Sequence, residues 1–148
     1  MGWIVTDDIR EGDIIETPSK IPLTSLLFPG LVVPFVKHYA MAVKVDGKLM
    51  IVHNTIGNNP SIETFEKVFS GRRIGRVLRT GVTSEEILSR YEECKENPYD
   101  FADNNCEDFV SNMAGGIDIG FDQRNGFAIL TAIVIVIILV LIFSKSNQ

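Results

Sequence analysis

Residues 37–53 of the chain read KHYAMAVKVDGKLMIVH, and they carry the clearest secondary-structure signal of the sequence. Two apolar runs flank the dipeptide Asp46-Gly47. An Asp-Gly pair between two such runs is typical of a tight two-residue turn, because both turn positions need a positive φ. The stretch therefore predicts an antiparallel β-hairpin in which Ala40 lies opposite His53.

The hairpin also brings together the two histidines of the chain. Alternate residues of a strand share one face of the sheet, so His38 lies on the same side as Ala40 and Ala42. His53 lies diagonally across from His38, at roughly 7–8 Å between α-carbons. The small alanines between the histidines leave room for another element to pack close to this face.

Outside the hairpin, Gly12–Thr17 predicts a first strand that Pro18 closes, and Arg73–Arg79 predicts a further strand. Ser61–Phe69 fits either a strand or a helix. Thr83-Ser84-Glu85-Glu86 starts a helix with a capping box, and its apolar face follows at Ile87, Leu88, Tyr91 and Cys94.

A second helix is expected after the cap Asn104-Asn105, and Gly115-Gly116 ends it. Its apolar residues repeat at helical spacing: Cys106, Phe109, Val110 and Met113. These elements predict an α+β fold. We expect an antiparallel sheet of four to six strands with the Cys106 helix against one face.

The domain organisation follows from the distribution of apolar residues. The chain has 148 residues, enough for one globular domain. The run 127–143 carries no charge, and as a helix it would be about 25 Å long, close to a bilayer core of roughly 30 Å. We expect a domain over 1–120, a linker over 121–126, a transmembrane anchor over 127–143 and a short tail over 144–148. A C-terminal anchor leaves the ribosome last, so the domain is expected on the cytoplasmic side.

Charge and cysteine content narrow the function classes. The formal net charge of −5 argues against general nucleic-acid binding, which needs a basic surface. Two cysteines are too few for a disulfide framework, so we expect free thiols in a reducing compartment. Several basic residues lie close together in the sequence, and they either contact anionic lipid head groups or form a solvated strand face. They are Lys67, Arg72, Arg73, Arg76 and Arg79.

The segment Ile21–Val36 is apolar but interrupted by Pro22, Pro29, Gly30 and Pro34. These breaks exclude a regular helix and a central strand. Two interpretations stay open: an exposed loop that contacts a ligand or lipid, or a loop that folds back on the core.

Cys106 is the candidate nucleophile, because it is expected in the first turn of its helix. Helix N-termini carry partial positive charge and free N–H groups, which favour a thiolate. If this helix packs on the alanine-lined face, Cys106 meets His38, which can act as its base. His53 would then fix the orientation of the His38 ring, and the backbone N–H of Cys106 is a candidate oxyanion donor.

Two other interpretations of these residues stay open. In the first, Cys106 is a small buried hydrophobe and both histidines are polar residues at an edge. In the second, His38, His53 and Cys106 bind zinc, although no fourth ligand has recognisable spacing. We expect no metal and no cofactor, and the sequence indicates no oligomeric state.

Four blocks, in this order, resemble lecithin retinol acyltransferase-like proteins: residues 12–16 (GDIIE), 37–43 (KHYAMAV), 51–53 (IVH) and 104–110 (NNCEDFV). These proteins are circularly permuted relatives of the NlpC-type, papain-like cysteine hydrolases, and the likeness covers roughly residues 8–116. The resemblance implies Cys106 as nucleophile, His38 as general base and His53 as the orienting residue. It also implies a thioester acyl-enzyme.

Phospholipase and acyltransferase members of this family carry a C-terminal hydrophobic anchor, as this chain does. Asp108 stands where the family usually has histidine, and Ser19–Val36 looks like an insertion. Residues 99–106 (YDFADNNC) also resemble PPPDE-type (iso)peptidases, which remove ubiquitin-like modifiers.

We therefore expect a membrane-anchored, cysteine-dependent hydrolase or acyltransferase that acts on membrane phospholipid acyl esters. Its partners would be the phospholipid substrate and, through Phe127–Phe143, the bilayer itself. One alternative is a PPPDE- or NlpC-type peptidase acting on a protein or peptide. The other is a non-catalytic, membrane-bound interaction module.

Overall fold

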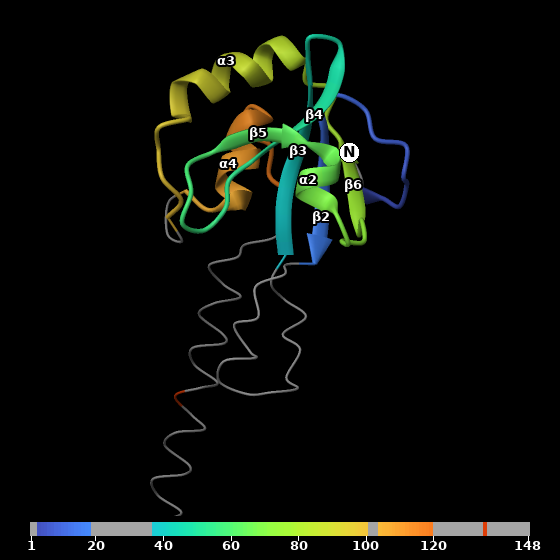
Figure 1. Ribbon diagram of the computed structural model, residues 1–148, viewed down its shortest axis with the longest axis horizontal. Helices are drawn as coiled ribbons and strands as arrows, with labels where there is room; N and C mark the ends of the chain where they lie inside the picture. The colour runs from blue at the N-terminus through green and yellow to red at the C-terminus, as the bar shows by residue number, and fades with distance from the viewer. Residues whose placement is uncertain (1–2, 19–36, 101–103, 120–134, 136–148) are drawn as a thin grey trace, which may run out of the picture.

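The computed structural model describes residues 3–18, 37–100, 104–119 and 135. Its described part contains a six-stranded sheet in the order β1-β6-β2-β3-β4-β5, with every neighbouring pair antiparallel. The strands are β1 (Trp3–Ile4), β2 (Asp13–Pro18), β3 (Lys37–Val45), β4 (Lys48–His53), β5 (Ser61–Thr64) and β6 (Arg76–Arg79). The helices are α2 (Phe65–Phe69), α3 (Ser84–Cys94) and α4 (Cys106–Met113) (Figure 1). The predicted α+β class with an antiparallel sheet is confirmed.

The central hairpin has the predicted register. Ala40 pairs with His53, and the pairing continues to the turn, where Val45 pairs with Lys48. Asp46 and Gly47 have φ angles of 49° and 76°, the left-handed conformation that a two-residue turn of this kind requires.

The ambiguous stretch Ser61–Phe69 divides into two elements. Ser61–Thr64 pairs with β4 as the edge strand β5, and α2 follows at once. Thr64 ends the strand and caps the helix, because its hydroxyl accepts a hydrogen bond from the backbone N–H of Lys67. The predicted strand Arg73–Arg79 is shorter than expected and covers only Arg76–Arg79.

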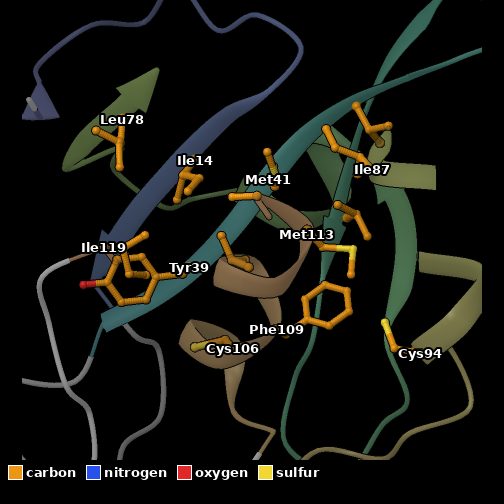
Figure 2. Packing of buried hydrophobic residues seen from close by; sticks show 14 residues of the cluster. Ile14, Tyr39, Met41, Leu78, Ile87, Cys94, Cys106, Phe109, Met113 and Ile119 are labelled. Carbon is orange, nitrogen blue, oxygen red and sulfur yellow. The ribbon is translucent and has the colours of Figure 1, made fainter. Parts of the chain in front are cut away.

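The two faces of the sheet carry different helices. The apolar residues of α3 and α4 form one buried cluster with Tyr39, Met41 and Val43 of β3, shown in Figure 2. The alanine-lined face instead packs against Val68 and Phe69 of α2. The Cys106 helix covers one face of the sheet, as expected, but it is the face of Tyr39 and Met41, so the condition under which Cys106 would meet His38, packing on the alanine-lined face, is not met.

Side-chain volume explains this arrangement. Interiors are close-packed, so the space between a sheet and a pair of helices has to be filled by large side chains. On β3 those are Tyr39, Met41 and Val43, each fully buried. Ala40 and Ala42 are small, so α2 packs close to the sheet there through Phe69 and its neighbour Val68.

Several predicted segments lie outside the described residues. These are the apolar segment within 19–36, the linker 121–126, the tail 144–148 and, apart from Ile135, the anchor 127–143. Within the described ranges, no helix combines the length and apolar character that crossing a bilayer requires. Pro18 and Lys37, which flank residues 19–36, pair with each other at one end of the sheet (Figure 1).

Candidate active site

Helix α4 begins at Cys106 because Asn105 caps it. The Asn105 side chain accepts hydrogen bonds from the backbone N–H groups of Glu107 and Asp108, and the Asp108 carboxylate reaches back to the Asn105 backbone. This capping box satisfies donors that a helix start otherwise leaves free. It holds Cys106 at the first position of the helix, as the sequence predicts.

The Cys106 thiol is buried, with 4% of the residue exposed, and lies against the start of β3. Its sulfur donates a long hydrogen bond of 3.9 Å to the backbone carbonyl of Lys37. Because that carbonyl belongs to the peptide unit that leads into His38, the sulfur lies within about 7 Å of the His38 α-carbon. Figure 2 shows Cys106 at the end of α4 that lies below Tyr39.

The structure brings the two histidines together. Their ring centroids are 5.5 Å apart, and the rings meet edge to face at 78°. The Nε2 atom of His53 lies 3.3 Å from the Ser61 hydroxyl and 3.6 Å from a carboxylate oxygen of Glu63, both on the neighbouring strand β5. His53 is thus held by β5 through its Nε2 atom.

Both imidazoles are kept neutral by their surroundings. Burial is the main cause that lowers the pKa of His38 to about 3, and the charges of His53 and Arg72 add to it. Burial also lowers the pKa of His53, although the Glu63 carboxylate opposes the shift. A neutral imidazole has a free ring nitrogen that can accept a proton, but a pKa near 3 makes His38 a weak base in this arrangement.

The structure does not join the His38 ring to the sulfur. His38 shares its face of the sheet with Ala40 and Ala42, whereas the Cys106 side chain packs with Tyr39 on the other face. The Nε2 atom of His38 is buried and has no hydrogen-bond partner within the described part of the chain. The two groups therefore lie on opposite faces of the sheet, near the first residues of β3.

A buried ionic network, not foreseen from the sequence, lies on the Tyr39 side of the sheet. Glu16 accepts hydrogen bonds from Lys37 at 2.9 Å, from Tyr39 at 3.3 Å and from Arg76 at 2.5 Å. Burial alone would raise the pKa of Glu16, but the hydrogen bonds from Arg76 and Lys37 hold it below its usual value. The network ties β2 and β6 to the start of β3, whose Lys37 carbonyl the sulfur contacts.

Two further contacts connect the start of α4 to the rest of the site. The Asn54 amide, directly after His53, donates to the backbone carbonyl of Asn104 at 2.9 Å. The pKa of the Tyr99 phenol is raised, mainly by burial and also by Cys106, while a hydrogen bond from the Cys106 backbone acts in the opposite direction. Tyr99 therefore lies beside the N–H that is the candidate oxyanion donor.

A zinc centre receives no support from the described residues, because no group of three or more His, Cys, Asp or Glu side chains there is arranged to hold a metal ion. Cys94, expected in the core, is buried in the apolar cluster, and it is a free thiol, as is Cys106. Comparisons with known proteins found no matching family model, no matching curated protein and no matching solved structure.

Proposed function

We propose that the protein is a cysteine-dependent hydrolase or acyltransferase that acts on phospholipid acyl esters through a thioester on Cys106. The observation that carries this proposal is the position of the thiol: the first residue of a capped helix, 3.9 Å from the carbonyl that precedes a buried, neutral histidine. A permuted papain-like arrangement, as in the NlpC superfamily, is the fold that this proposal implies.

In the first step, Cys106 transfers its proton to a ring nitrogen of His38, and the thiolate attacks the ester carbonyl carbon. The C–O bond of the ester breaks, and the lysolipid alkoxide takes the proton back from the His38 imidazolium. The acyl group is then a thioester on the sulfur. Water, or the hydroxyl or amine of an acceptor, attacks this thioester and regenerates the thiol.

This proton transfer requires the first residues of β3 to rearrange so that the His38 ring turns toward α4, because His38 and Cys106 lie on opposite faces of the sheet. The buried Nε2 atom of His38 forms no hydrogen bond among the described residues, so turning the ring breaks none there. The sulfur is within about 7 Å of the His38 α-carbon, and an imidazole nitrogen extends several ångströms from that carbon. Catalytic hydrogen bonds commonly shorten only when substrate is bound.

A lipid substrate is favoured by where the apolar segments join the domain. Residues 19–36 begin and end at paired Pro18 and Lys37, whose carbonyl contacts the sulfur. The described domain ends at Ile119, which is buried in the same cluster as Tyr39 and Cys106 (Figure 2). The predicted anchor 127–143 follows shortly after in the sequence. We infer a single-pass membrane protein whose domain lies on the cytoplasmic side.

The test is activity-based labelling of the full-length protein in mixed micelles, with an ester-mimicking lipid electrophile and a peptide electrophile side by side. We expect the lipid probe to label Cys106, and Cys106→Ala to remove the label while Cys94→Ala keeps it. Labelling by the peptide probe alone would favour the peptidase alternative. Absence of labelling by both probes would favour a non-catalytic module.

A further inference from the structure

Arg72 stands apart from most basic residues of this region because no acidic side chain in the described part of the chain pairs with it. Lys67 pairs with Glu63, Arg76 with Glu16, and Arg79 with Asp8, whereas Arg72 and Arg73 have no acidic partner within the described residues. Arg72 is nevertheless half-buried, and its Nε atom is buried without a hydrogen-bond partner there. A partly desolvated guanidinium of this kind is costly unless an anion accompanies it.

The position of Arg72 is set by the turn after α2. Its backbone N–H donates to the carbonyl of Phe69 at 2.8 Å, which places the residue at the C-terminal end of the helix. Phe69 itself is buried against the alanine-lined face, so Arg72 emerges on the same face as the two histidines.

A surface cavity of about 710 Å³ opens at this point. Arg72 and Arg73 line it together with the rings of Phe65 and Phe69, which lie 4.8 Å apart. Pro18, the last residue of β2, also lines it. Asp7 is the one acidic residue in the described lining, and it forms no ion pair with either arginine. Two unneutralised cations therefore face an open, partly apolar space.

The two histidines add unsatisfied polar atoms on the same face. The Nε2 atom of His38 and the Nδ1 atom of His53 are buried without hydrogen-bond partners in the described ranges, and each residue is 7% exposed. After burial, the charge of Arg72 is a minor cause that lowers the pKa of both rings, so the guanidinium lies close enough to oppose their protonation. An anion beside Arg72 would offset that positive charge.

We propose that Arg72 and Arg73 form a phosphate-binding site in the cavity beside α2, on the face of the sheet that carries His38 and His53. A planar guanidinium donates two parallel hydrogen bonds to a phosphate, so Arg72 supplies the principal contact and Arg73 a second cation. The phosphate belongs either to a lipid head group or to a free phosphate. This site lies beyond the proposed function, because it binds phosphate whether or not Cys106 reacts.

The experiment measures phosphate binding to the full-length protein in detergent micelles. Inorganic phosphate is titrated while the side-chain Nε–H signal of Arg72 is followed by NMR. A second arm uses flotation with vesicles of phosphatidylcholine, with and without phosphatidic acid. We expect Arg72→Gln to weaken binding at least about 10-fold, the usual effect of losing a charge-assisted hydrogen bond. Arg10→Gln, which removes an equal charge from an exposed pair with Asp8, should leave binding unchanged.

Each outcome decides the proposal. Saturable binding of inorganic phosphate that depends on Arg72 supports a site for free phosphate. Arg72-dependent binding of phosphatidic acid vesicles alone supports a lipid head group as the source. Binding that Arg10→Gln and Arg72→Gln weaken equally, or no binding in either arm, overturns it. Arg72→Lys keeps the positive charge but loses the two parallel N–H donors of the guanidinium, so it should bind phosphate with intermediate strength. This variant also serves as a control for a folding defect in Arg72→Gln. All measurements are repeated in Cys106→Ala, so that failure of the catalytic proposal leaves this test intact.

Discussion

Replacing Cys106 by alanine is expected to lower the rate of phospholipid acyl hydrolysis by at least about 10³-fold. Without the sulfur, no thioester forms, and only binding and oxyanion stabilisation remain to accelerate the reaction. The fold should survive, because the thiol occupies a small buried volume and its hydrogen bond to Lys37 is long. The measurement is fatty acid release from mixed micelles, together with the melting temperature of each variant.

Cys94→Ala is the matched control for this experiment. Cys94 is also a buried free thiol of the same apolar cluster, but burial raises its pKa, which disfavours the reactive thiolate. We expect it to retain activity within a few-fold. Comparable activity in Cys106→Ala and Cys94→Ala would contradict the role of Cys106, whereas loss in both would point to a structural role for the cluster.

His38→Gln is expected to have the second largest effect. As the general base, His38 should contribute about 10²–10⁴-fold to kcat/KM. His53→Gln removes the same ring from the neighbouring strand but leaves the base in place, so its loss should be smaller. An unchanged rate in His38→Gln, with loss confined to Cys106→Ala, would mean that another group takes the thiol proton.

The same substitution should also change the stability of the protein in acid. The pKa of His38 is about 3 in the folded protein and near 6.5 in the unfolded chain. Between these values the unfolded chain binds a proton that the folded protein does not. The free energy of unfolding therefore falls as the pH falls below 6.5, by up to about 1.4 kcal/mol per pH unit from this residue. Above pH 6.5 the ring is neutral in both states and has no effect.

Urea unfolding between pH 4 and pH 8 measures this contribution. In the acid range, His38→Gln should take up about one proton fewer on unfolding than the native protein does. At the alkaline end, the free energy of unfolding should depend on pH equally in the two proteins. Burial lowers the pKa of His53 as well, so part of the acid sensitivity should remain. An identical acid slope in the native protein and in His38→Gln would show that the ring titrates normally in the fold.

Much of the fold follows from local sequence signals. The Asp46-Gly47 turn sets the register of β3 and β4, and the capping residues Thr83 and Asn105 mark the starts of α3 and α4. These signals are strong because each is satisfied by residues close in sequence. Helix α2 has only five residues, too few to show the periodic pattern of a helix. The sequence therefore left Ser61–Phe69 ambiguous between a strand and a helix.

Which helix covers which face could not be predicted from the hairpin. Period-two alternation separates Tyr39 and Met41 from Ala40 and Ala42, but it does not say which side α4 will choose. The pairing of the histidines was predictable, because it depends on the hairpin register alone. The contact of the sulfur with Lys37 was not, because it depends on how a helix 69 residues further along packs on the sheet.

The partners of the charged residues could not be predicted either, because they too depend on contacts between residues far apart in the sequence. Arg72 and Arg76 look alike in the sequence, yet Glu16 neutralises Arg76 across 60 residues and leaves Arg72 without a partner in the described part of the chain. Ser61 and Glu63 hold His53 only because β5 pairs with β4, which the sequence left undecided.

The proposed function depends on an intermediate in which the acyl group is bound covalently to Cys106. The most direct measurement is intact-protein and peptide mass spectrometry after rapid mixing of the full-length protein with a phospholipid of defined acyl chain, followed by acid quench. We expect a mass increase of one acyl residue on the peptide that contains Cys106, removed by neutral hydroxylamine. Turnover of the lipid with no adduct on that peptide, or an adduct on Cys94 instead, would contradict it.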